Sequence, residues 1–66
     1  MVHTERYIKL KKLAILTENL SKTIDKMAFN EDLPVFDSEL ESCLKTSYHA
    51  LMNEISQLKN ELGLWL

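Results

Sequence analysis

The second half of the chain carries an apolar side chain at nearly every third or fourth position. Because an α-helix makes one turn in about 3.6 residues, such spacing places these side chains along one face of a single helix. We therefore predict a helix over about 38–62 with one continuous apolar stripe. The stripe consists of Leu44, Tyr48, Leu51, Ile55, Leu58, Leu62 and Trp65.

The first half repeats this pattern with one polar interruption, at Thr17, and predicts a helix over about 5–29. Each stripe spans about three heptads, which is near the lower limit for a coiled coil. Two ordinary amphipathic helices in a small bundle are the alternative. The first stripe consists of Leu10, Leu13, Thr17, Leu20, Ile24 and Met27.

Local signals mark the ends of both helices. Thr4 is a suitable N-cap for the first helix, since its side-chain oxygen can accept a hydrogen bond from an unpaired backbone N–H. The stretch 30–37, NEDLPVFD, holds the only proline and predicts the connector. Ser38 and Glu41 match a capping box at the start of the second helix. Gly63 stands where a left-handed C-terminal cap is expected.

Two helices of equal length, about 38 Å each, joined by a short connector predict an antiparallel helical hairpin. The expected fold is all-α, with 1–66 as a single coiled-coil-like domain. Charges favour this orientation, although each exposed ion pair contributes only about 0.2–1 kcal/mol. We expect two groups to meet: Arg6, Lys9, Lys11 and Lys12 with Glu54 and Glu61, and Lys22 and Lys26 with Glu39 and Glu41. A parallel homodimer of the second helix, with Glu54 and Lys59 paired across it, is a competing arrangement.

Composition limits how such a hairpin is stabilised. A domain of 66 residues buries only about 60% of its unfolded surface. Cys43 is the single cysteine, so a disulfide framework is excluded. We therefore expect the core to be completed by oligomerisation or by a protein partner. The net charge of -2 is too small to argue for a polyanionic partner. No signal peptide or membrane span is expected, which favours a cytoplasmic protein.

Large apolar residues outside the two stripes are the candidates for a partner-binding surface. Ile8 and Ile15 are expected on the outer side of the first helix, with Tyr7 and Leu16 beside them. Such an outer apolar track indicates a partner. The alternative is that the first helix breaks near Thr17 and both faces pack inside a three-helix monomer. The expected partner-binding residues are Tyr7, Ile8, Ile15, Leu16, Met52 and Trp65.

Residues able to carry chemistry are few, and we expect no enzyme, cofactor or metal site. Cys43 and His49 are six residues apart and point to different faces of a helix, whereas a nucleophile needs its base within hydrogen-bonding reach. The acidic residues around the connector lack the alternating oxygen ligands and central glycine of a calcium loop. Gly63 is the only glycine, so no phosphate-binding loop is present.

Part of the sequence resembles the Hha/YmoA group, small helical modulators that bind the nucleoid protein H-NS. The matching residues are Tyr7, Leu20, Ile24, Lys26, Phe29, Glu39, Leu40, His49, Leu51 and Trp65. In architecture, the expected hairpin is also similar to the RNA-binding Rop hairpin and to hairpin co-chaperones of type III secretion. We expect a protein-interaction module: an adaptor, assembly subunit or co-chaperone. The alternative that the resemblances imply is a nucleic-acid-associated regulator, acting through a nucleoid protein or directly through Arg6, Lys9, Lys11 and Lys12.

Overall fold

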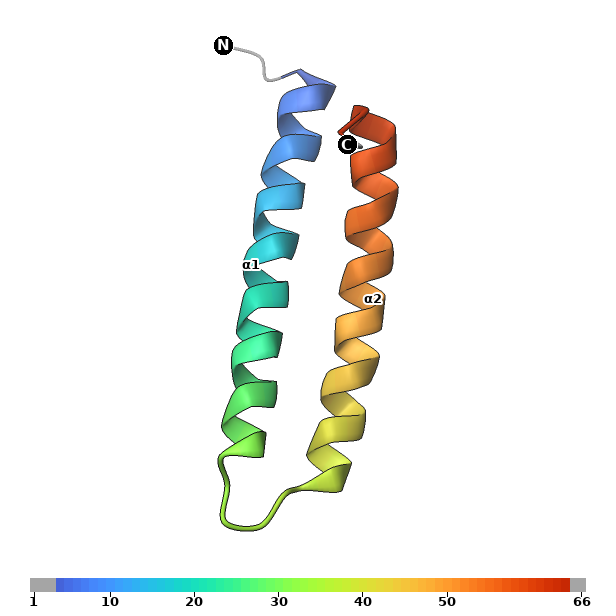
Figure 1. Ribbon diagram of the computed structural model, residues 1–66. Coiled ribbons are helices and arrows are strands. Elements are labelled where there is room, and N and C mark those ends of the chain that lie inside the picture. The colour runs from blue at the N-terminus through green and yellow to red at the C-terminus, as the bar shows by residue number, and fades with distance from the viewer. Residues whose placement is uncertain (1–3, 65–66) are drawn as a thin grey trace.

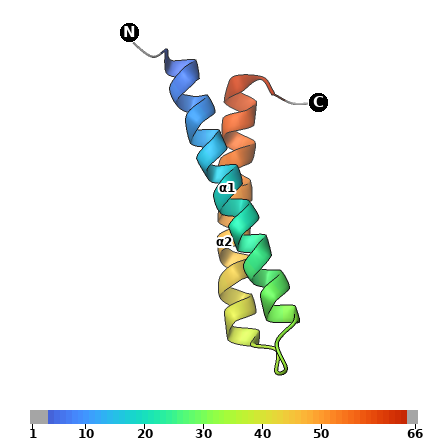
Figure 2. The same cartoon turned by 90° about the vertical axis from the view of Figure 1, so that its left-hand side faces the viewer.

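The computed structural model describes residues 4–64, which form two long helices packed antiparallel (Figure 1). Helix α1 spans Glu5–Glu31 and helix α2 spans Ser38–Leu62. Figure 2 shows the helices crossing at a shallow angle, and the molecule measures 51 × 23 × 19 Å. The prediction of an all-α helical hairpin is confirmed. Helix α1 continues through Thr17, so the alternative of a break there is wrong.

The helix ends confirm two of the three expected caps. Thr4 Oγ1 accepts a hydrogen bond from the Tyr7 N–H at 3.1 Å. Gly63 adopts the left-handed conformation, with φ of 68°, at the end of α2. The capping box at Ser38 is wrong by one residue, because Asp37 is the N-cap and its side chain accepts from the Leu40 N–H at 3.0 Å. Helix α1 also extends to Glu31, two residues beyond the expected end.

The core lies between the helices and is a single layer thick. Leu16, Ile55 and Leu58 form its centre, with Leu13, Leu20 and Leu51 packed around them. Among the described residues, the most buried apolar side chain is Leu58, which remains 6% exposed. Two helices can bury one stripe each, but no third element covers the edges of that stripe.

The apolar stripe expected for α2 is confirmed from Leu44 to Leu62, since Leu44, Ile55, Leu58 and Leu62 are buried and Tyr48 and Leu51 are partly buried. Its last predicted member, Trp65, lies outside the described residues. The expected stripe of α1 is only half correct. Leu13, Leu20 and Met27 are partly buried, whereas Leu10, Thr17 and Ile24 are exposed. Leu16, expected on the outer side, is instead in the core at 8% exposure. The inner stripe of α1 therefore consists of Leu13, Leu16, Leu20, Thr23 and Met27.

Candidate protein interaction surface

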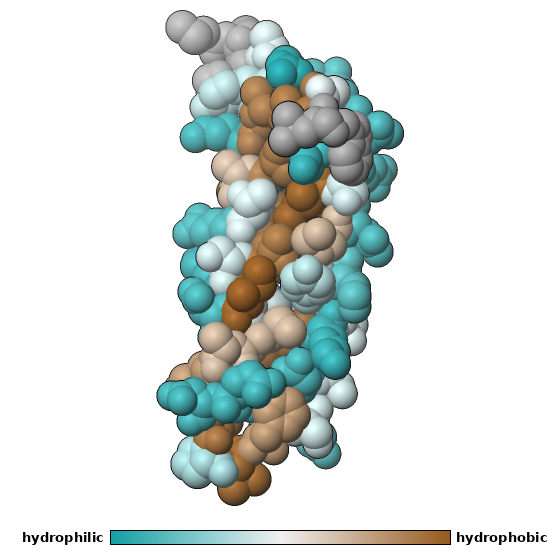
Figure 3. Space-filling view, in the orientation of Figure 1, coloured by the Kyte–Doolittle hydropathy of each residue, from teal (hydrophilic) through white to brown (hydrophobic). Residues whose placement is uncertain are grey.

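One flank of the hairpin is apolar along much of its length. Leu10, Thr17 and Ile24 follow one another at seven-residue intervals on α1, beside the inner stripe. On α2, Tyr48 shares a groove with Ile24, and Met52 follows Tyr48 by one helical turn on the same side. Leu10 is 39% exposed, Ile24 47% and Met52 37%. Figure 3 shows the resulting hydrophobic track between the two helices. We refer to Leu10, Thr17, Ile24 and Met52 as the open flank.

Near the connector, the open flank widens into a shallow groove of about 450 Å³. Its apolar walls are Ile24, Met27, Ala28 and Tyr48, and the carboxylates Glu31 and Glu41 border it. The groove presents mainly apolar surface with acidic groups at its rim. A partner with an apolar side chain and a neighbouring cation fits such a surface.

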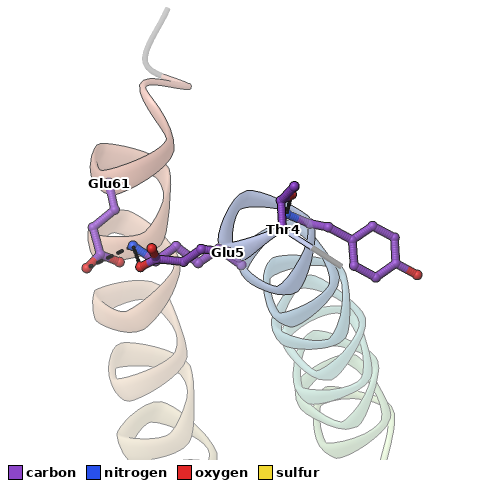
Figure 4. Close-up of polar contacts among 5 residues, drawn as sticks. Thr4, Glu5 and Glu61 are labelled. Carbon is purple, nitrogen blue, oxygen red and sulfur yellow. Dashed lines mark hydrogen bonds and ion pairs between the residues drawn. The ribbon is translucent and has the colours of Figure 1, made fainter. Parts of the chain in front are cut away.

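The opposite flank of the hairpin is charged. A groove of about 500 Å³ there is lined by Lys9, Lys12, Glu54, Gln57, Leu58 and Glu61. Lys9 Nζ lies 3.3 Å from Glu5 and 3.9 Å from Glu61 (Figure 4). Lys9 is therefore paired both along α1 and across the hairpin, and an interface on this polar flank would have to desolvate its charges.

The expected charge contacts are confirmed at one end only. Lys9 pairs with Glu61 on α2, and Arg6 Nη1 donates to the Leu62 carbonyl oxygen at 3.1 Å. Lys22, expected near the start of α2, pairs instead with Glu18 on its own helix at 3.6 Å. Glu18 lies one helical turn before Lys22, and its carboxylate is closer to the Lys22 ammonium group than any carboxylate of α2 is.

The six residues expected to bind a partner do not form one surface. Ile8 and Ile15 are exposed on α1, outside its inner stripe and on the opposite side of it from Leu10, and Tyr7 is exposed near the same helix end. Leu16 is buried in the core, so its expected outward placement is wrong. Met52 belongs to the open flank, and Trp65 lies outside the described residues.

The four basic residues considered for nucleic-acid binding also face different directions. Arg6 is engaged with the Leu62 carbonyl, and Lys9 with Glu5 and Glu61. Lys11 Nζ lies 6.0 Å from the centre of the Tyr7 ring. Lys12 lines the polar groove beside carboxylates. A phosphate backbone needs several cations along one line, and these four do not provide it.

A second apolar area was missed from the sequence. Phe29, Val35 and Phe36 are exposed at the connector end, Val35 by 80%. The signal that could have revealed it is the segment Leu33–Phe36, LPVF, because connectors are normally polar. Phe29 lies near the end of α1, and Val35 and Phe36 lie in the connector.

Side chains that could act in catalysis or bind a metal are few in the described part of the chain. Cys43 is a free, exposed thiol, and His49 contacts the Tyr48 ring edge-on, with centroids 5.5 Å apart. Within residues 4–64 no cluster of three His, Cys, Asp or Glu side chains could hold a metal. Neither helix is long and apolar enough to cross a bilayer. No protein-family model, curated protein or solved structure matches the chain.

Proposed function

We propose that this chain is a non-enzymatic protein-interaction module whose docking surface is the open flank. The observation that supports the proposal is the uncovered line of Leu10, Ile24 and Met52 beside a core only one layer thick. In a monomeric protein, a contiguous apolar track is normally covered by another element of the fold. A helix supplied by a second molecule would take the place of that missing element.

The energetic gain from such docking is moderate for each residue and adds up along the flank. Burying a Leu, Ile or Met side chain completely stabilises a complex by about 1.5–3 kcal/mol. The three apolar residues of the flank are already more than half buried, so covering the remainder contributes roughly 1 kcal/mol each. The larger gain comes from shielding the core edge, where Met27 and Tyr48 line the adjoining groove.

The difference between the two flanks gives the module an orientation. On the polar flank, Lys9 already has carboxylate partners, and breaking those contacts would offset the gain from new ones. On the open flank, the main groups to desolvate are carbon atoms. A partner is therefore directed to one side of the hairpin, which suits an adaptor, an assembly subunit or a co-chaperone.

The test is an affinity capture from the cells that produce the protein, with the wild-type chain compared with two single variants. Ile24→Glu places a charge on the open flank, and Ile15→Glu places the same charge on the outer side of α1. We expect the proteins captured by the wild type, including untagged copies of the chain, to be lost with Ile24→Glu and retained with Ile15→Glu. Equal capture by both variants, with helicity unchanged in each, would overturn the proposal.

A further inference from the structure

We infer that the occupant of the open flank is a second copy of this chain, with the connectors of the two hairpins at opposite ends. The inference rests on the proposed function, because it names the partner for the same surface. The resulting assembly is a two-fold symmetric bundle of four helices. In it, α1 of one copy lies antiparallel to α1 of the other, and the α2 helices are paired in the same way.

The exposed area of the hairpin is suited to such an assembly. The chain exposes 5314 Å², whereas a globular monomer of this size exposes about 4,300 Å². The excess of about 1,000 Å² is close to the area of about 800 Å² that each partner buries in an interface of standard size. A second hairpin has the length needed to cover this elongated surface from end to end.

The positions of the apolar residues favour pairing of α1 with α1. A two-fold axis makes every contact reciprocal. Thr17 lies seven residues after Leu10 and seven before Ile24. An axis next to Thr17 therefore places Leu10 of each copy against Ile24 of the other, and it brings the two Thr17 side chains together. Apolar residues then meet apolar residues at both ends of the α1 pair.

The other face-to-face arrangement, with both connectors at the same end, is less suitable. It places α1 of one copy against α2 of the other. At the register set by Lys9 and Glu61, Leu10 then lies level with Asn60 of the second copy, and Ile24 with Thr46. Both apolar side chains face polar ones, and Lys59 and Lys45, one residue away, carry ammonium groups that would have to lose water.

Charge complementarity selects the same arrangement. The connector end is acidic and the opposite end of α1 is basic. Opposed connectors set the acidic end of one copy against the basic end of α1 in the other, whereas adjacent connectors bring the two acidic ends together. The acidic group is Glu31, Asp32, Asp37, Glu39 and Glu41, and the basic group is Arg6, Lys9, Lys11 and Lys12.

Sedimentation velocity of the purified chain tests whether a second copy binds. We expect the wild type to sediment with the mass of two chains at tens of micromolar. Ile24→Glu should raise the dissociation constant by about 100-fold or more, because a symmetric interface contains the change twice. Ile15→Glu should leave the dissociation constant unchanged. Circular dichroism of each variant at the same concentration establishes that the helices are retained.

Cross-linking tests the orientation without disturbing the apolar contacts. In a Cys43→Ser background, Thr17→Cys places one thiol at the expected two-fold axis, and a short bis-maleimide should join two such chains. Ile15→Cys in the same background is the control and should remain uncross-linked. In the arrangement with adjacent connectors, Thr17→Cys should instead react only when mixed with Met52→Cys.

These results separate failure of the inference from failure of the proposed function. A dimer that cross-links through Thr17→Cys supports the inference, and a dimer that cross-links only in the mixture with Met52→Cys overturns it. A wild type that sediments as one chain at tens of micromolar also overturns it. In that case, the proposed function survives if Ile24→Glu alone abolishes capture of another protein, and it fails if Ile24→Glu and Ile15→Glu behave alike.

Discussion

The side-chain amide of Asn30 forms two hydrogen bonds with the backbone of Asp37. Asn30 Nδ2 donates to the Asp37 carbonyl oxygen at 2.9 Å, and the Asp37 N–H donates to Asn30 Oδ1 at 3.1 Å. Asn30 is 0% exposed, and it is the only polar side chain buried in the described part of the chain. These bonds join the end of α1 to the N-cap of α2, so a single side chain closes the connector.

Replacing this amide should loosen the hairpin at its closed end. We expect Asn30→Ala to lower the free energy of unfolding by about 2 kcal/mol, because two hydrogen bonds are lost and the backbone groups of Asp37 are left without them. Urea denaturation followed by circular dichroism, at one fixed protein concentration, gives the value.

The matched control is Asn53→Ala, since Asn53 is exposed on α2. A change on the surface of a helix should stay within about 0.5 kcal/mol of the wild type. Asn30→Asp keeps the size of the side chain but removes the donor and buries a carboxylate, so it should destabilise at least as much as Asn30→Ala. An Asn30→Ala variant as stable as the Asn53→Ala control would rule out a structural role for the two bonds.

The core position of Leu16 makes a second prediction. We expect Leu16→Ala to reduce the free energy of unfolding by about 2–3 kcal/mol, because it leaves a cavity between the helices. Its neighbour Ile15 is 60% exposed, so Ile15→Ala should cost less than about 1 kcal/mol. The same denaturation experiment compares the two. A larger loss for Ile15→Ala would place the inner stripe of α1 on the other side of the helix.

The sequence could not decide which side of α1 faces α2, and the reason is physical. Leu13, Leu20 and Met27 belong to both heptad patterns of this helix. One pattern adds Leu10, Thr17 and Ile24, and the other adds Leu16 and Thr23. Helix α1 is apolar over a face wider than one neighbouring helix can cover, so packing with α2 determines the choice. The residues left over are the ones that form the open flank.

Helix α2 was predicted more accurately because its apolar face is narrow. Tyr48, Ile55 and Leu58 each have polar neighbours on both sides in the sequence, and only one register buries them. Its boundaries also agree, since Gly63 and the connector proline leave few alternatives. The cap at Asp37 was missed because Asp37 and Ser38 are both good N-cap residues. The bonds from Asn30, which involve a position seven residues earlier, favour Asp37.

The left-handed conformation of Gly63 makes a third prediction. An added Cβ would meet no atom within 4 Å there, so Gly63→Ala introduces backbone strain without a clash. We expect a loss of about 1 kcal/mol in the free energy of unfolding. Gly63→Asn should lose less, because asparagine tolerates this conformation better than alanine. Thermal unfolding of both variants tests this order, and equal losses would contradict it.

The carboxylate of Glu41 makes the last prediction. Its Oε2 atom is buried and has no hydrogen-bond partner among the described residues, and Met27 and Tyr48 line the same groove. Removing water from a polar atom without replacing its hydrogen bond lowers stability by about 1–3 kcal/mol. Glu41→Met keeps the length of the side chain and removes the charge, so that loss should be recovered.

A second effect of Glu41→Met has the opposite sign and needs its own control. Glu41 and Glu39 both lie in the first turn of α2, where a negative charge stabilises a helix by about 0.3–1 kcal/mol. Glu39 is exposed, so Glu39→Met measures this contribution alone and should lower stability. We therefore expect the Glu41→Met variant to be more stable than the Glu39→Met variant, with a free energy of unfolding that is higher by about 1–2 kcal/mol. Equal values for the two variants would show that water still reaches the Glu41 carboxylate in solution.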